Sequence, residues 1–325
     1  MEDRKKTITV MTPAYNEEEG IRECVVAVRE VFEKQLPEYN LEHLFIDNCS
    51  TDRTVEILRE MAKEDSRIKV IVNSRNFGPN TSGYYGLLQM SGDAVIQVLA
   101  DLQTPPDRII DFVRKWEEGY PLVIGVRRSM EEGFLMQRSR QLFYKLIRTI
   151  SDVEQVRNFC GFSLFDRKMI DILRGIDDHS PYFKGIMMEI GYDRAFIEYD
   201  QPLRKHGKSR HSISDLVNLA IFSMSGYSNF PIRLMTIYGF FTFVVSFLVS
   251  MVYLVLKLIY WDQFSIGIAP ITVGVFFFGS IQILCMGIVG EYLNRAFDHA
   301  RRRPLILEKE RINFDTPAKL PGSKK

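Results

Sequence analysis

The chain has almost no net charge and few cysteines. Its 42 lysine and arginine residues nearly balance 41 aspartate and glutamate residues, so it lacks the basic excess of nucleic-acid-binding proteins and we expect no nucleic-acid partner. The four cysteines are scattered, with no pair at the spacing of a metal site: Cys24, Cys49, Cys160 and Cys285. We therefore expect reduced, structural cysteines rather than disulfides or a zinc site.

Two long stretches, 234–256 and 263–290, contain no charged side chain. A helix needs roughly 20 apolar residues to cross a bilayer core of about 30 Å, so both stretches predict transmembrane helices, which we place at 233–260 and 264–293. A pair of buried core helices is the alternative, although such long uncharged runs are rare in soluble folds. No apolar run follows the initial MEDRKK, so we expect no cleaved signal peptide.

Basic residues flank the two apolar stretches, whereas the segment between them is short and poor in basic residues. Arg233 precedes the first stretch, and four arginines follow the second: Arg295, Arg301, Arg302 and Arg303. Because positive residues remain on the cytoplasmic side, we expect an integral membrane protein with both termini in the cytoplasm, in a bacterial inner membrane. The expected parts are a cytoplasmic domain at 1–211, an amphipathic juxtamembrane helix at 212–232, the two spans and a cytoplasmic tail at 294–325.

Short β-branched runs alternate with helical patterns between residues 7 and 130. The runs are TITVMTP, LEHLFIDN, IKVIVNS, AVIQVLAD and PLVIGVR. This alternation predicts an α/β domain with a mainly parallel sheet covered by helices. In the intervening segment TDRTVEILREMAKED, Val55, Leu58 and Ala62 share one apolar face. Ligands of such open sheets bind at the carboxyl ends of the strands.

Polar residues follow four of these runs, at 13–17, 47–52, 73–78 and 101–103. Asp47 can accept a hydrogen bond from the imide N–H of uracil or from the corresponding edge of guanine. Pro13 and Tyr15 can shape a slot for the base, and Glu17 lies within reach of the same ligand. Ordinary turn and helix-cap chemistry is the alternative for these residues.

The order of these segments resembles a known enzyme family. MTPAYNEEEGI, FIDNCSTDRT, SRNFGPNTSGYYGL and ADLQTPPD are similar to segments of the inverting glycosyltransferases of family 2, whose nucleotide-sugar domain is called GT-A. The later segments GVRRSMEEGFLMQRSRQLFYKL, RKHGKSRHS and GEYLNRAFDHARRRPL, with the apolar stretches, resemble the polyprenyl-phosphate glycosyltransferases, relatives of dolichol-phosphate mannose synthase. The resemblance covers nearly the whole chain. It implies a nucleotide-sugar donor, for which we prefer UDP, an undecaprenyl or similar phosphate acceptor, and a homo-oligomer such as a tetramer.

The fourth run ends in Leu99-Ala100-Asp101, with one aspartate where enzymes of this kind usually have two. Mg²⁺ typically takes only one or two carboxylates together with substrate phosphates. Asp101 and the side-chain oxygen of Gln103 are therefore the candidate ligands of Mg²⁺ or Mn²⁺, and Asp101 is the candidate catalytic residue.

The segment 204–211, RKHGKSRH, is strongly basic. A mobile loop around Gly207 could fold over a diphosphate through four side chains: Arg204, Lys208, Ser209 and Arg210. A polybasic segment beside a membrane also attracts anionic lipid, and the two roles are compatible.

Three other arginines are candidate phosphate or nucleotide contacts, with solvated surface charge as the alternative. Arg75 is a candidate for the nucleotide. The resemblance assigns Arg127 and Arg138 to the phosphate of the lipid acceptor, and the helix expected at 133–151 turns its apolar side toward the membrane.

A second carboxylate of the family pattern is also missing, because many relatives have GDFRL where this chain has CGFSL, with Gly161 at the aspartate position. A hydroxyl acceptor needs a base to remove its proton. A phosphate monoester has a second pKa near ~6 and is mostly ionised at neutral pH, so a single aspartate fits a phosphate acceptor. Two alternatives stay open: an inactive scaffold that binds lipid or a partner, and a polysaccharide synthase, although the QxxRW element of those enzymes is absent.

Overall fold

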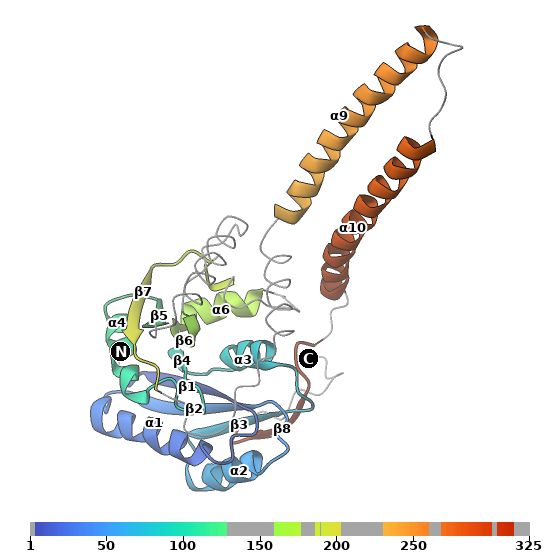
Figure 1. The fold of residues 1–325 in the computed structure, drawn as a ribbon. Helices are drawn as coiled ribbons and strands as arrows, with labels where there is room; N and C mark the ends of the chain where they lie inside the picture. Colours follow the sequence, from blue (N-terminus) through green and yellow to red (C-terminus); the bar gives the residue numbers. More distant parts are fainter. Residues whose placement is uncertain are drawn as a thin grey trace. The chain divides into compact units, whose positions relative to one another are not determined.

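The structure is a computed structural model that describes residues 4–128, 159–176, 186–188, 190–202, 230–259, 268–300 and 304–314 (Figure 1). The chain divides into two compact units. The first unit contains the sheet and the helices around it, and the second contains α9 and α10.

The first unit is built on an eight-stranded sheet in the order β7-β5-β6-β4-β1-β2-β3-β8. The strands are β1 Thr7–Ala14, β2 Asn40–Asp47, β3 Ile68–Asn73, β4 Ala94–Gln97, β5 Leu122–Arg127, β6 Phe159–Asp166, β7 Arg194–Tyr199 and β8 Glu308–Ile312. Strands β1 to β4 pair in parallel, as do β5 and β7, whereas β6 and β8 run antiparallel to their neighbours. The expected α/β fold with a mainly parallel sheet is confirmed.

Helices cover both faces of this sheet (Figure 1). One face carries α1 Ile21–Gln35, α2 Thr54–Glu64 and α4 Ile109–Glu117, and the other carries α3 Pro79–Leu88 and α6 Arg167–Gly175, with a short 3-10 turn, η1, at Pro106–Arg108. In α2 the expected apolar face is present, because Leu58 and Ala62 are buried and Val55 packs against the same core. Burial of these faces holds the helices against the strands.

Helix α3 lies unusually close to the strands beneath it. A Cβ atom at Gly86 would be 2.5 Å from Cγ1 of Ile46 on β2 and 3.1 Å from Sδ of Met11 on β1. Only glycine fits at this position without displacing the core. This close packing fixes the position of α3 on the sheet. Helix α3 begins directly after the loop that leaves β3.

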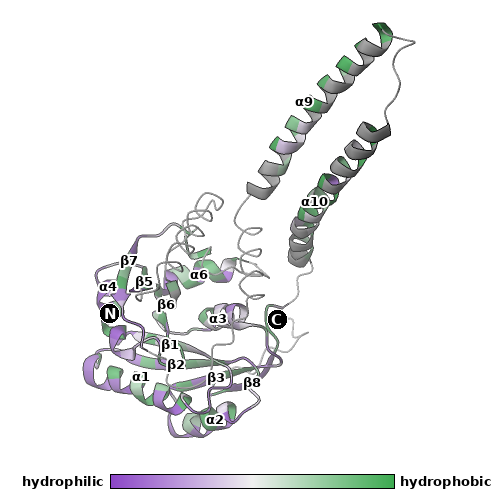
Figure 2. Ribbon diagram, viewed as in Figure 1, coloured by the Kyte–Doolittle hydropathy of each residue, from purple (hydrophilic) through white to green (hydrophobic). Residues whose placement is uncertain are grey.

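The second unit consists of α9 Phe230–Ile259 and α10 Ile268–Ala300, of 30 and 33 residues. Apolar residues occur along both helices (Figure 2). Many side chains of these helices lie outside the described part, and within that part no helix is long and apolar enough to cross a membrane. The spans at 233–260 and 264–293 therefore stay predictions.

The chain returns to the first unit after α10. Strand β8 pairs antiparallel with β3 at the edge of the sheet. The strand lies within 294–325, where the sequence pattern predicts a tail without a strand.

Candidate active site at the carboxyl ends of the strands

The carboxyl ends of β1, β2, β3 and β4 lie along one edge of the sheet. Because the four strands are parallel and adjacent, Ala14 lies beside Asp47, Asp47 beside Val72, and Met11 beside Gln97. The loops that follow these strands therefore begin next to one another. The structure thus gathers the four polar segments at one edge, as expected.

Asp47 is completely buried and organises the turn that follows β2. Both of its oxygens accept hydrogen bonds from Ser50, one from the backbone N–H at 2.9 Å and one from the hydroxyl. Burial raises the pKa of Asp47, and the hydrogen bonds from Ser50 partly offset this increase. In this conformation both carboxylate oxygens are bonded to Ser50, so Asp47 holds the conformation of the loop that follows β2.

The loops after β1 and β2 are tied to each other. The backbone N–H of Asn16 donates to Oγ of Ser50 at 2.9 Å, and its side-chain Oδ1 accepts from the N–H of Thr51 at 2.8 Å. Asn16 has φ 55° and Cys49 has φ 66°, a backbone conformation that residues other than glycine rarely adopt. Such strain concentrates at functional sites. The neighbouring candidates Pro13, Tyr15 and Glu17 are half-buried along this edge.

A network of asparagine side chains orders the 74–78 loop, which joins β3 to α3. Oδ1 of Asn48 accepts hydrogen bonds from the backbone N–H of Phe77 at 3.0 Å and from Nδ2 of Asn73 at 3.2 Å. Nδ2 of Asn48 donates to Oδ1 of Asn76 at 2.8 Å. The exposed Arg75 places its guanidinium 4.0 Å from the centre of the Phe77 ring. The three asparagines lie within the polar segments 47–52 and 73–78, but their position at adjacent strand ends predicts no individual role for them.

Asp101 lies in a tight turn after β4. Its Oδ1 accepts a hydrogen bond from the N–H of Gln103 at 3.1 Å, and the N–H of Leu99 donates to Oγ1 of Thr104 at 2.7 Å. Leu102 has φ 56° within this turn. Asp101 and Gln103 are half-buried and offer oxygen donors of the kind that Mg²⁺ and Mn²⁺ accept. Over the described residues, no group of three or more His, Cys, Asp or Glu side chains could hold a metal.

Gly161, at the position of the second missing carboxylate, lies on β6 close to Gln97 of β4. Strands β4 and β6 pair Gln97 with Ser163, two residues along β6 from Gly161. Gly161 has φ +98°, and a Cβ atom there would be 3.2 Å from Nε2 of Gln97. Gln97 therefore occupies part of the space that a side chain at position 161 would need.

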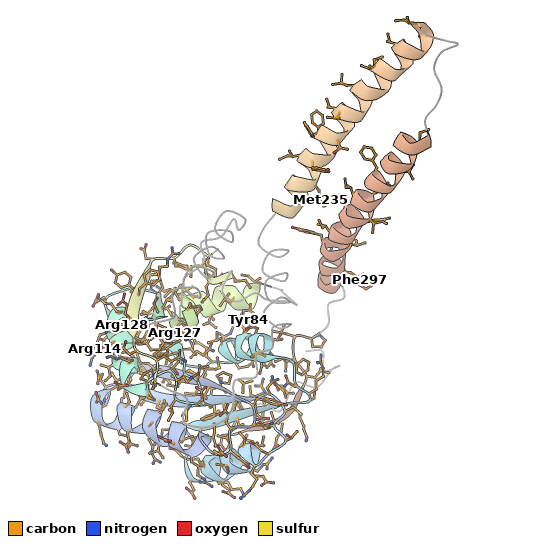
Figure 3. The ribbon with its side chains drawn as sticks, in the orientation of Figure 1. Tyr84, Arg114, Arg127, Arg128, Met235 and Phe297 are labelled. Carbon is orange, nitrogen blue, oxygen red and sulfur yellow. The ribbon has the colours of Figure 1, made fainter. Side chains whose placement is uncertain are left out.

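Arg127 lies at the carboxyl end of β5 (Figure 3). Its Nη1 donates to Oε1 of Gln201 at 2.8 Å, whereas its Nε is buried and has no partner among the described residues. The remaining phosphate candidates lie outside the described residues: Arg138, Arg204, Lys208, Ser209 and Arg210. The helix expected at 133–151 lies outside them too.

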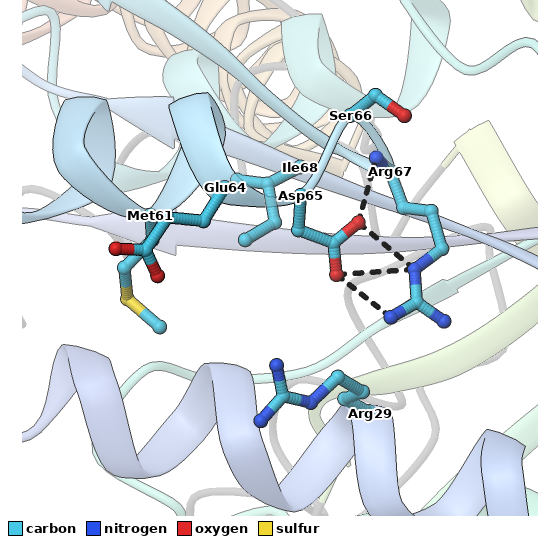
Figure 4. Close-up of a pocket in the computed structure, with 7 residues that line it drawn as sticks. All are labelled: Arg29, Met61, Glu64, Asp65, Ser66, Arg67 and Ile68. Atoms are coloured by element: carbon cyan, nitrogen blue, oxygen red, sulfur yellow. Dashed lines mark hydrogen bonds and ion pairs between the residues drawn. The ribbon is translucent and has the colours of Figure 1, made fainter.

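A hollow of about 440 Å³ lies elsewhere on the first unit (Figure 4). It is lined by Arg29 of α1 and by residues from the end of α2 to the start of β3, where Asp65 and Arg67 form an ion pair at 2.7 Å. These residues lie at the amino end of β3, the opposite edge from Asp47 and Asp101, so this hollow is separate from the candidate active site.

Comparisons with known proteins give the following matches. Residues 9–174 match the family described as Glycosyl transferase family 2. The chain is 31% identical over 300 residues to the uncharacterized glycosyltransferase YkcC of Bacillus subtilis (strain 168), covering 92% of each protein. It is 30% identical over 303 residues to the bactoprenol glucosyl transferase of Shigella phage SfV, covering 93% of this chain and 98% of that protein. Among solved structures, it is similar to mannosyl-3-phosphoglycerate synthase of Rubrobacter xylanophilus, with 15% identity, a TM-score of 0.44 and coverage of 66% and 71%.

Proposed function

The chain belongs to glycosyl transferase family 2 and is a glycosyltransferase, and on this premise we propose that it moves a sugar from a nucleotide donor onto a polyprenyl phosphate, with inversion at the anomeric carbon. The observation that carries the choice of acceptor is the turn after β4, which offers one carboxylate, Asp101, while Leu99 and Gly161 stand at the positions where the family pattern has further acids. An acceptor phosphate is already ionised at neutral pH and needs no protein base. Relatives named bactoprenol glucosyl transferases match over almost their full length, which supports the same acceptor class.

The donor nucleotide would bind along the edge formed by the loops after β1, β2 and β3. Pro13, Tyr15 and Glu17 border the base, and UDP is our preferred donor. Asp47, buried beneath Ser50 in the structure, would accept the imide N–H once the Ser50 hydroxyl turns aside. Arg75 of the 74–78 loop would contact the same ligand. Asp47 has a second role in this proposal, because its hydrogen bonds to Ser50 hold the loop that the base contacts.

Asp101 and Gln103 are the proposed ligands of Mg²⁺ or Mn²⁺. When bound, a divalent cation neutralises charge on the leaving nucleoside diphosphate. The chain contributes a carboxylate and an amide from one turn, and diphosphate oxygens complete the set. Three residues outside the described part, Arg204, Lys208 and Arg210, with Ser209 between them, would close over the diphosphate.

The acceptor phosphate would contact Arg127 and Arg138. The buried Nε of Arg127, which has no partner among the described residues, supports an anionic ligand at the end of β5, because an unsatisfied charged donor is costly. Both arginines orient the phosphate oxygen toward the donor sugar and act without proton transfer.

The acceptor also implies a membrane. Helices α9 and α10 carry large apolar side chains that are mostly exposed, among them Phe240 at 69%, Ile283 at 74% and Met286 at 75%. A bilayer would cover these side chains. We propose two spans with the catalytic domain and both termini in the cytoplasm, and a homo-oligomer of such chains.

Binding of UDP by the purified full chain tests the donor site. Calorimetry with Mg²⁺ should give saturable binding, and Asp101→Asn or an excess of chelator should weaken it about tenfold or more. The control is Asp107→Asn, which changes an exposed aspartate on η1 and should leave the affinity unchanged. Equal affinities for wild type and Asp101→Asn would remove Asp101 from the donor site.

A further inference from the structure

We propose that β8 positions the 74–78 loop for nucleotide binding, through a buried cluster of three side chains: Tyr85, Glu308 and Arg311. The inference rests on the proposed donor site. The loop runs from the end of β3 to the start of α3, and β8 contacts both of these elements. The residues that follow α10 would then act in donor binding from outside the family match at 9–174.

The first contact fixes the start of the loop. Strand β8 pairs with β3 up to Asn73, which lies opposite Glu308. One residue further, the N–H of Ser74 donates to the carbonyl of Leu307 at 2.8 Å. The backbone that enters the loop is therefore held by β8 beyond the end of the ladder.

The second contact fixes α3, where the loop ends. The hydroxyl of Tyr85 on α3 donates to Oε1 of Glu308 at 2.6 Å, and Arg311 donates to Oε1 of Gln89 at 2.8 Å. Arg311 and Glu308 form an ion pair at 2.6 Å, with side chains only 7% and 1% exposed. Burial and the Glu308 carboxylate raise the pKa of Tyr85, so the phenol stays protonated and remains a donor.

A bulge in β8 separates this cluster from a second, solvent-exposed ion pair. The register shifts between Val72 and Asn73 of β3, so that Val72 lies opposite Glu310 and Asn73 opposite Glu308. The extra residue in β8 interrupts the alternation along the strand, so that Glu308 and Glu310, two positions apart, point to opposite faces of the sheet. Glu308 therefore faces α3, whereas Glu310 pairs with Arg59 of α2 at 2.8 Å, with side chains 38% and 39% exposed.

The buried cluster therefore positions the 74–78 loop, whereas the exposed ion pair only attaches β8 to α2. Both glutamates attach β8, but only Glu308 reaches the helix in which the 74–78 loop ends. A buried ion pair that loses one member leaves an uncompensated charge, so a change at Glu308 should displace α3 and the loop together. A change at Glu310 affects only an exposed pair, which contributes little.

The test compares Tyr85→Phe, Glu308→Gln and Glu308→Ala with the control Glu310→Ala in the purified full chain. Calorimetry with UDP and Mg²⁺ gives the affinity, steady-state transfer gives separate KM values for donor and acceptor, and thermal unfolding checks that each variant is folded at the assay temperature. We expect Glu308→Ala to weaken UDP binding and raise the donor KM by about tenfold, with the acceptor KM unchanged. Glu308→Gln keeps an acceptor for Tyr85 and should be milder, and Glu310→Ala should match wild type.

Tyr85→Phe keeps the packing and removes only the hydroxyl, so it decides the outcome if Glu308→Ala does not fold. Wild-type UDP affinity in a folded Glu308→Ala or in Tyr85→Phe would overturn the positioning role. Equal losses in Glu308→Ala and Glu310→Ala would also overturn it, because they would indicate general attachment of β8. A wild-type chain that binds no UDP would contradict the proposed donor site itself.

Discussion

Gly161 stands where the family pattern has an aspartate, and its surroundings leave little room for a side chain. Its φ of +98° disfavours any side chain, and Nε2 of Gln97 would lie 3.2 Å from the added Cβ atom. Gly161→Asp should lower the free energy of unfolding by about 1–3 kcal/mol without increasing transfer, as measured by denaturant unfolding and a transfer assay.

Gly119 provides a matched control, because its φ is +102° and no atom lies within 4 Å of the Cβ position. Gly119→Asp should show the backbone strain alone and cost less than Gly161→Asp. The difference should disappear when both are measured in a Gln97→Ala background. A difference that persists there would show that Gln97 is not the cause.

His43 predicts a specific pH dependence of stability. The side chain is 1% exposed and bonds to the hydroxyl of Thr12 at 3.1 Å, and burial lowers its pKa from 6.5 to about 3. Below pH 6.5 the unfolded chain binds a proton that the folded chain does not. The free energy of unfolding should therefore fall by up to about 1.4 kcal/mol per pH unit, from that point down to the folded pKa.

Denaturant unfolding between these pH values compares wild type with His43→Gln, which retains a partner for Thr12 but does not titrate. The variant should lack this part of the slope. Equal slopes in the two proteins would show that His43 is not the titrating group.

Local sequence patterns locate Asp47 and Asp101, because each stands at the end of an apolar run. They could not reveal that Asp47 is buried beneath Ser50, or that Asn48, Asn73 and Asn76 bond to one another. Those contacts join residues 25 and 28 positions apart, and they exist only once β2 and β3 are paired. The same holds for the closeness of Gly161 on β6 to Gln97 on β4.

Strand periodicity predicted β1 to β5 and the apolar face of α2. It did not predict β8, whose sequence EKERI has four charged residues and no alternation of apolar side chains. An edge strand of this kind is determined by its partners, here the β3 ladder, the buried Arg311 and Glu308 pair, and Arg59. The parallel sheet was predictable, whereas its two antiparallel strands were not.

The close contact of α3 with the sheet gives a prediction for this helix. Gly86→Ala would place a methyl group 2.5 Å from Cγ1 of Ile46, so it should destabilise the chain by about 1–3 kcal/mol. Gly83→Ala in the same helix would meet only Nε2 of Gln97 at 4.0 Å, and should be neutral or stabilise the helix by up to about 1 kcal/mol. Thermal unfolding of both variants checks the prediction, and equal effects would contradict the packing argument.

The chain passes between the catalytic domain and the proposed membrane region twice. The first unit leads into α9, and after α10 the chain returns to the sheet as β8. Alkaline extraction of membranes that contain the full chain tests the two proposed spans. We expect the chain to stay in the membrane pellet, and its release into the supernatant would contradict the spans.

The most direct test of the proposed function is sugar transfer by the purified full chain. The chain is incubated with Mg²⁺, a polyprenyl phosphate and a panel of nucleotide sugars, and the lipid products are identified by mass spectrometry. We predict that one donor gives a polyprenyl phosphate carrying one added sugar, and that Asp101→Asn lowers the rate by about a hundredfold or more while Asp107→Asn does not. Binding of UDP without any lipid product from any donor would contradict the proposed transfer and identify the chain as an inactive, nucleotide-binding scaffold.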